Sequence, residues 1–224
     1  CDSLNIQKRN EVLIGWSKDG FHWNRENKKP FLPVSEDFHA WNAGNVQSTA
    51  GSPLIVGDSL YLYVSGRYNS KPKHDSNFAT GLAMLRRDGF VSMRAGRKEG
   101  YVEIKTQIPA NGNYLFVNAD VKGTLAVEVL DDNGQPMEGF TKKDCISMKK
   151  SDKTKQMISW EKHPGVTSLV GKTVRLKFYL NQADIYAFWI SAWQTGESGG
   201  YTGGGGPGLS DKGIDTPMDK LKNN

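Results

Sequence analysis

Short apolar runs alternate with polar turns along most of the chain, and this pattern predicts strands rather than helices. In the runs at 59–65 (SLYLYVS), 100–107 (GYVEIKTQ) and 172–180 (KTVRLKFYL), an aliphatic or aromatic residue recurs at every second position. Such a period of two is typical of a strand with one buried face. The spacing of 3–4 residues that marks an amphipathic helix is scarce. The expected fold class is therefore all-β.

Turn residues separate the expected strands. Asp19-Gly20, Lys122-Gly123 and Asn181-Gln182 are examples, since Gly and Asn adopt left-handed backbone conformations at little steric cost. Many short strands divided by such turns are typical of a β-sandwich or jelly roll. The runs predict strands at 11–16, 21–25, 52–56, 59–65, 79–86, 89–94, 100–107, 113–121, 123–130, 154–160, 172–180 and 184–191.

The pattern of apolar and polar residues changes near residue 78, after a polar stretch at 68–77. We expect three regions: 1–77 with a few hairpins, 78–195 as a jelly-roll-like β-sandwich, and 196–224 as an irregular Gly-rich tail. The few strands of the first region leave their own apolar faces uncovered. That region is therefore expected to be part of a larger structure.

Composition limits the partners of the chain. The formal net charge is +5, but the Lys and Arg residues are spread along the 224 residues instead of forming one basic stripe. This distribution indicates solvated surface rather than a nucleic-acid interface. Because no window approaches the ~20 apolar residues that cross a bilayer, no membrane span is expected.

Metal and cofactor sites are also not expected. The two cysteines, Cys1 and Cys145, allow at most one disulfide, and the four histidines lack metal-binding spacing. Cys145 is expected to be a small buried apolar residue. The Gly-rich run at 199–208 lacks the Lys-Ser/Thr of a phosphate-binding loop. Cys1 is compatible with a lipid-bearing mature terminus or with a cut inside a longer protein, and both readings stay open.

The stretch 17–23, SKDGFHW, follows the apolar run VLIGW and predicts a tight hairpin. Its Ser17 and Asp19 side chains can bond to the backbone of the turn, and Gly20 allows the reversal. Trp23 is expected to pack beneath the turn. Asp19 is therefore expected to cap the turn and not to act as a catalyst.

This hairpin resembles the Asp-box of β-propellers, with a spacing one residue shorter. It also looks like the S-x-D-G-x-x-W hairpin of five-bladed propeller glycoside hydrolases, the group that includes families 32 and 43 and their relatives. Residues 41–67 look like the last blade of such a propeller. The ranges that look like the C-terminal β-sandwich of uncharacterised bacterial members are 78–94, 127–145 and 174–191.

The resemblance implies the C-terminal part of a glycoside hydrolase-like protein: the last propeller blade or blades followed by a sandwich. It implies hydrolysis of poly- or oligosaccharides outside the cytoplasm, in a secreted, periplasmic or lipid-anchored protein, without a redox cofactor. The paired carboxylates of that reaction would belong to earlier blades, on the same or a separate chain. Catalytic residues are therefore not assigned, and this chain alone is expected to lack them.

The candidate binding residues come from WNAGNVQ and the end of the next strand. Trp41 offers a flat face for a sugar ring, while Asn42, Asn45 and Gln47 offer donors and acceptors for vicinal hydroxyls. Arg67 can pair with a carboxylate. The competing interpretation is structural: Trp41 caps the blade, the amides satisfy loop backbone, and Arg67 forms an interdomain salt bridge.

Two other functions stay open at this stage. The sandwich, rich in Trp, Tyr and Phe, can be a non-catalytic carbohydrate-binding module that uses exposed aromatic faces. It can also be purely structural and cover the apolar side and edge strands of the propeller. The sequence does not separate these two alternatives.

Overall fold

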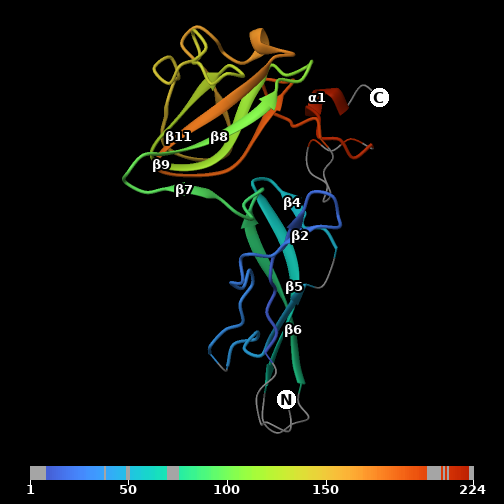
Figure 1. Cartoon of the computed structure of the whole chain (residues 1–224). Coiled ribbons are helices and arrows are strands. Elements are labelled where there is room, and N and C mark those ends of the chain that lie inside the picture. The colour runs from blue at the N-terminus through green and yellow to red at the C-terminus, as the bar shows by residue number, and fades with distance from the viewer. Residues whose placement is uncertain are drawn as a thin grey trace. The chain divides into compact units, whose positions relative to one another are not determined.

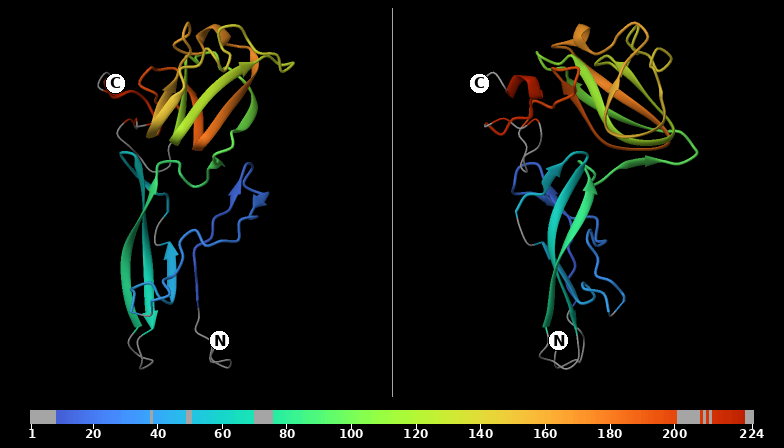
Figure 2. Two further views of the ribbon diagram at one scale, coloured as in Figure 1. Left: turned by 90° about the vertical axis from the view of Figure 1, so that its left-hand side faces the viewer. Right: turned by 180° about the vertical axis from the view of Figure 1, so that it is seen from behind.

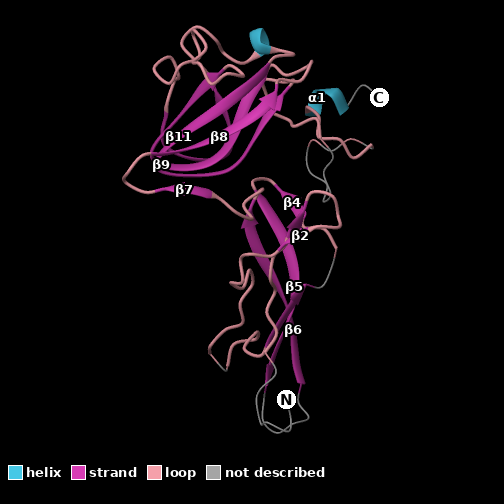
Figure 3. Cartoon of the chain, viewed as in Figure 1, coloured by secondary structure: helices cyan, strands magenta, loops and turns pink. Residues whose placement is uncertain are grey.

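A computed structural model describes residues 9–37, 39–48, 51–69, 76–200, 208, 210 and 212–221 (Figure 1). Strands dominate these residues, and helix is confined in them to the short 3-10 helix η2 and to α1 (Figure 3). The expected all-β class is therefore confirmed. The elements are β1 (Trp16–Ser17), β2 (Trp23–Asn24), β3 (Asn45–Ser48), β4 (Leu54–Val56), β5 (Ser59–Asn69), β6 (Ser76–Arg86), β7 (Met93–Ala95), β8 (Gly100–Gln107), β9 (Tyr114–Leu130), β10 (Met148–Ile158), η2 (Thr167–Leu169), β11 (Thr173–Ser191) and α1 (Met218–Leu221).

The chain divides into two compact units. Unit 1 comprises Cys1–Leu54 and Tyr61–Met84, and unit 2 comprises Ile55–Leu60 and Leu85–Asn224. The β4–β5 turn is thus grouped with unit 2, and the expected boundary after residue 77 falls inside β6.

Unit 1 is built on a four-stranded sheet in which β5 pairs with β3, β4 and β6. The pairing of β3 with β5 is antiparallel, with Asn45 opposite Arg67 and Ser48 opposite Val64. β5 and β6 run side by side as a long ribbon (Figures 1 and 2). A separate small hairpin pairs β1 with β2.

One face of this sheet carries a small core. Its buried cluster consists of Val34, Val46 and Val64, each 5% exposed or less. Val12, Leu32 and Ala83 pack against this cluster. The N-terminal segment is fixed over this face by a bridge between Val12 and Leu32.

Trp41, which is 38% exposed, covers two strands on the same face of the sheet. A Cβ added to Gly66 in β5 would lie 2.3 Å from the Trp41 indole, and one added to Gly81 in β6 would lie 2.4 Å from it. The indole therefore rests on the backbones of both strands, which only glycine permits at this distance. Gly66 pairs with Val46, so Trp41 lies on the face to which Val46 points.

Unit 2 is built on one five-stranded antiparallel sheet with the order β10-β9-β11-β7, in which β8 also pairs with β11. β8 lies along Thr173 to Leu180 of β11, and β7 along Ala183 to Ile185. The sheet curls strongly and forms a half-barrel (Figures 1 and 2).

Two hairpins predicted in this region are wrong. Residues 113–130 and 172–191 do not reverse, but form the long strands β9 and β11. The apparent turn at Asn181-Gln182 is a register shift in which Gln182 has φ 43°. A Cβ on Gly123 would lie 2.4 Å from the carbonyl oxygen of Asn181. The turn-type residues of both strands thus meet at one bulged bend.

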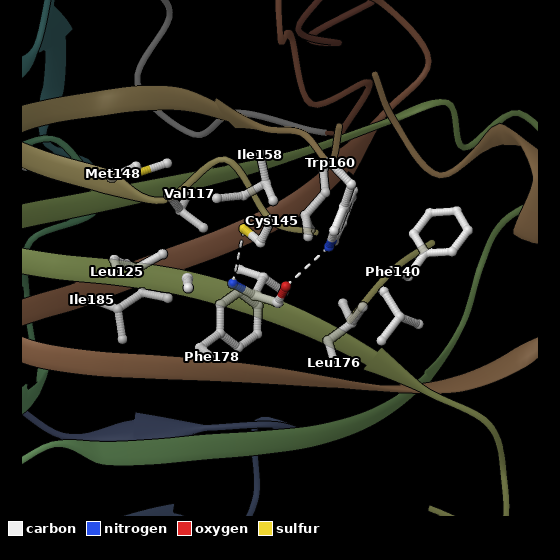
Figure 4. Close-up of a cluster of buried hydrophobic side chains, with 14 of the residues drawn as sticks. Val117, Leu125, Phe140, Cys145, Met148, Ile158, Trp160, Leu176, Phe178 and Ile185 are labelled. Atoms are coloured by element: carbon white, nitrogen blue, oxygen red, sulfur yellow. Dashed lines mark hydrogen bonds between the residues drawn. The ribbon is translucent and has the colours of Figure 1, made fainter. Parts of the chain in front are cut away.

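The concave side of the half-barrel holds the main core, with side chains such as Leu125, Leu176 and Phe178 fully buried (Figure 4). Loop residues close this core, since the Trp160 indole N–H donates to the Val127 carbonyl at 3.0 Å. The Val127 N–H donates to the sulfur of Cys145 at 3.2 Å. Burial raises the pKa of the Cys145 thiol. The expectation that Cys145 is a small buried residue is confirmed.

The C-terminal tail is held by hydrogen bonds in its described part. The Asp215 carboxylate accepts a hydrogen bond from the Ser198 N–H at 2.8 Å, and the Asp215 carbonyl accepts one from the Gly199 N–H at 3.1 Å. The Trp189 indole donates to the Gly196 carbonyl at 2.9 Å. Residues 201–207 of the Gly-rich run lie outside the described residues.

A buried polar cluster fixes the end of β6 within unit 2. The side chain of Asn118, fully buried, accepts a hydrogen bond from Arg86 Nε at 2.6 Å and donates to the Arg87 carbonyl at 2.5 Å. The Arg86 guanidinium also donates to the Ala119 carbonyl at 3.1 Å and lies 4.9 Å from the centre of the Tyr186 ring.

The packing of Trp41 on β5 predicts that a side chain at position 66 destabilises the fold. Gly66→Ala places a methyl group inside the indole, and we expect a loss of about 1–3 kcal/mol in the free energy of unfolding. Urea denaturation, with amide hydrogen exchange in β5, measures this loss. Gly51→Ala is the control, because a Cβ at Gly51 meets nothing within 4 Å. Equal effects of the two substitutions would contradict the packing. Trp41→Ala should reduce the cost of Gly66→Ala without removing it, because the added Cβ would still lie 2.9 Å from the carbonyl oxygen of residue 41.

The hydrogen bonds of Asn118 predict that an apolar residue at this position destabilises the fold. Asn118→Leu keeps the volume but leaves the Arg86 Nε and the Arg87 carbonyl without this partner, at a cost of about 1–3 kcal/mol per buried group. Asn111→Leu, at an exposed turn, is the matched control and should be nearly neutral. Denaturant unfolding compares the two variants, and an unchanged midpoint for Asn118→Leu would show that the cluster does not stabilise the fold.

Candidate functional site

The SKDGFHW hairpin is organised by its own polar side chains. The Asp19 carboxylate accepts hydrogen bonds from the backbone N–H groups of Phe21 at 2.9 Å and His22 at 2.8 Å. The Gly20 N–H donates to Ser17 Oγ at 2.9 Å, and Gly20 has φ 79°. The expected turn-capping role of Asp19 is confirmed.

The aromatic side chains of this hairpin are exposed. Phe21 is 87% exposed, Trp23 61% and Trp16 46%. The Trp23 indole donates to the Gly20 carbonyl at 3.1 Å, so the turn holds the ring while much of its surface meets solvent. Rigid aromatic groups of this size are usually covered by another part of a structure or by a partner.

The structure separates the predicted binding residues into two groups. Asn45 and Gln47 flank Val46 in β3, and successive side chains of a strand point to opposite faces. Because Val46 shares its face with Trp41, the two amides lie on the other face. Asn42, in the turn before β3, is half-buried, and its carbonyl accepts a hydrogen bond from the Ser35 N–H at 3.3 Å.

The second group gathers around Arg67. Asn45 is paired with Arg67 and Gln47 with Ser65, so these side chains share one face of the sheet. The Arg67 guanidinium lies 4.5 Å from the centre of the Phe78 ring, which is 64% exposed. We call the surface formed by Asn45, Gln47, Arg67 and Phe78 the Arg67 face.

Phe78 was not among the candidates, because the sequence places it at the expected start of a second domain. The signal is nevertheless present in the alternation of β6. Phe78, Leu82 and Met84 are exposed, whereas Ala83 packs against the core. The even positions of β6 from 78 to 84, which are apolar except for Thr80, therefore continue the Arg67 face.

Four further acidic residues of the N-terminal region have structural partners. Glu11 and Glu36 both pair with Arg9, at 2.9 and 2.8 Å, and the hydrogen bond from Arg9 lowers the pKa of Glu11. Asp37 accepts a hydrogen bond from the His39 N–H, and Asp58 accepts one from the Thr154 hydroxyl. The strands β3, β4, β5 and β6 contain no Asp or Glu.

These facts define the chemistry of the Arg67 face. It offers amide donors and acceptors, a guanidinium and an aromatic ring, which suit binding. It offers no carboxylate for general acid–base catalysis. Within the ranges that the structure describes, no group of three or more His, Cys, Asp or Glu side chains is placed to hold a metal ion.

The tryptophans of unit 2 give little support to a sugar platform there. Trp160 is 1% exposed, and Trp189 stacks on Phe116 with ring centres 5.7 Å apart. Tyr101 differs, because it is 62% exposed and carries the Lys177 ammonium 4.2 Å from its ring centre.

Beside Tyr101, Tyr179 donates to Glu128 at 2.7 Å. Burial, reinforced by this bond, raises the pKa of Tyr179 to about 12.

An open hollow of about 460 Å³ elsewhere in unit 2 is lined by residues that include Phe140 and His163, whose rings stack 4.2 Å apart. Phe140 is buried and offers no free ring face.

No protein family, curated protein or solved structure matches the chain. Among the described residues, no helix has the length and apolar character needed to cross a membrane.

The hairpin tip predicts a pH-dependent structure. Hydrogen bonds, from the His22 side chain first and then from the His22 and Phe21 N–H groups, lower the pKa of Asp19 below its ordinary value of 3.8. A lowered pKa means that the hairpin favours the carboxylate, so this stabilisation is present above pH 3.8 and is lost as the pH falls through the lowered pKa. Amide shifts of Phe21 and His22, followed by NMR, should change below pH 3.8. A midpoint at or above that value, or an unchanged titration in Asp19→Asn, would contradict this assignment.

Proposed function

We propose that this chain supplies the last blade and a C-terminal β-domain to a five-bladed propeller protein of the glycoside hydrolase type. The observation that carries the proposal is the uncovered face of the unit 1 sheet. On β6, Leu82 is 45% and Met84 67% exposed, on a sheet whose other face is covered by Trp41 and a small valine cluster.

The way in which β-sheets pack explains why these exposed apolar residues indicate a contact surface. Scattered apolar residues on a surface are ordinary, but a contiguous row along one strand marks a contact surface. Propeller blades pack their sheets against one another around a central channel. A blade without neighbours is expected to show such a row, and the exposed aromatic residues of the SKDGFHW hairpin support the same interpretation.

The role that we propose for the chain within such a protein is substrate binding. The Arg67 face presents Asn45 and Gln47, whose amides can pair with vicinal hydroxyls, and Phe78, whose ring can receive the apolar face of a sugar. In this proposal the acid and base come from other blades, and the absence of Asp and Glu from strands β3 to β6 supports it. A polysaccharide substrate implies an extracytoplasmic protein.

A second candidate is a carbohydrate-binding module in unit 2, where the structure has one curled five-stranded sheet in place of the predicted sandwich. The exposed Tyr101 with its neighbouring Lys177 favours this candidate, because a tyrosine face with a flanking donor is a suitable sugar contact. The structural role for unit 2 is the remaining alternative.

We expect the 224-residue chain to bind oligosaccharides without hydrolysing them. Calorimetric titration with a panel of oligosaccharides measures binding, and release of nitrophenol from nitrophenyl glycosides measures hydrolysis. Gln47→Ala should weaken binding roughly tenfold, the effect of one or two lost hydrogen bonds, while Tyr101→Ala should not. Ordinary turnover by the chain alone would overturn the proposal, and loss of binding in Tyr101→Ala only would assign the sugar site to unit 2.

A further inference from the structure

Arg67 differs from the ion-paired arginines of the chain in its surroundings. Arg86 pairs with Asp152, Arg94 with Asp184 and Arg175 with Glu103. No ion pair joins Arg67 to any of the described residues. Its contact is the ring of Phe78, with the guanidinium carbon 4.5 Å from the ring centre.

An aromatic ring orients a guanidinium without neutralising it. The planar guanidinium can stack on the ring and keep its N–H donors at the edge, where they are available to another group. The surrounding strands do not supply an acceptor of opposite charge, since β3, β4, β5 and β6 have no Asp or Glu. With respect to the described residues, which exclude residues 70–75 between β5 and β6, Arg67 therefore presents an oriented positive charge on an exposed sheet face.

The side chains next to Arg67 add amide groups to the N–H donors of its guanidinium. Asn45 lies directly across from Arg67 in the β3–β5 pair, and Gln47 follows on the same face and is exposed. A guanidinium with two flanking amides matches a carboxylate or sulfate group attached to a ring that carries hydroxyls. Phe78 adds an apolar surface beside the charge.

We infer that the Arg67 face binds an anionic sugar residue, with its carboxylate or sulfate group on Arg67 and its hydroxyls on the amides. This inference rests on the proposed function and specifies the substrate class of the same site. In the assembled propeller, catalytic carboxylates would repel an anionic substrate, and Arg67 offsets that repulsion locally.

The test compares charged and neutral forms of the same backbone. The probes are oligogalacturonate and its methyl ester, for a carboxylate, and dextran sulfate oligosaccharides and plain dextran oligosaccharides, for a sulfate. Calorimetric titration of the full chain at physiological ionic strength should show at least one anionic form bound roughly tenfold more tightly than its neutral counterpart, the effect expected of a charge-assisted hydrogen bond. The anionic form that shows the preference identifies the group.

Variants separate a specific site from the general attraction of a chain with net charge +5. Arg67→Gln should abolish the preference for the anionic form, and Phe78→Leu, which removes the ring that orients Arg67, should reduce it. Arg97→Gln removes an equal charge from an exposed turn of unit 2 and should preserve the preference. Thermal unfolding of each variant checks that the fold is retained.

The outcomes distinguish this inference from the proposed function. Equal binding of charged and neutral probes, lost in Gln47→Ala, would overturn the anionic substrate and leave a neutral sugar site in place. Equal losses in Arg67→Gln and Arg97→Gln would show general charge attraction and also overturn it. If none of the four probes binds, the inference fails, whereas the proposed sugar site fails only if the panel of neutral oligosaccharides also shows no binding.

Discussion

The contact of the Trp41 indole with the backbones of Gly66 and Gly81 determines how unit 1 is built. One side chain covers two strands at distances that leave no room for a Cβ, and the small valine cluster continues this layer. All the covering material of unit 1 in the described residues is therefore concentrated on one face of the sheet. The opposite face carries Arg67, Phe78 and the exposed apolar positions of β6.

That asymmetry links the fold to the proposed function. The uncovered face combines a polar end near Arg67 with an apolar stretch along β6. The polar end has the donors that a sugar needs, and the apolar stretch has the surface that a neighbouring blade needs. The strands β3, β4, β5 and β6 of this sheet have no Asp or Glu, which agrees with a role in binding rather than in acid–base chemistry.

Structure that rests on hydrogen bonds within a few residues was predictable from the sequence. Structure that depends on the pairing of distant strands was not. The hairpin at 17–23 follows from Asp19 and Gly20, because its hydrogen bonds lie within the turn. The bend at Gly123 and Gln182 has the same residue types, but the contact between β9 and β11 makes it a bulge. The register of β3 likewise decides that Trp41 and Asn45 lie on opposite faces, and no local pattern contains that information.

The central claim is that the β6 side of the unit 1 sheet is covered only in a larger assembly. Hydroxyl-radical footprinting of Met84 measures this directly, with the buried Met148 as an internal reference, since the two are 67% and 5% exposed. We predict rapid oxidation of Met84 in the chain alone and strong protection when the chain is bound to the neighbouring blades that the proposed function requires. Protection of Met84 to the level of Met148 in the chain alone, or continued oxidation in the assembly, would contradict the account.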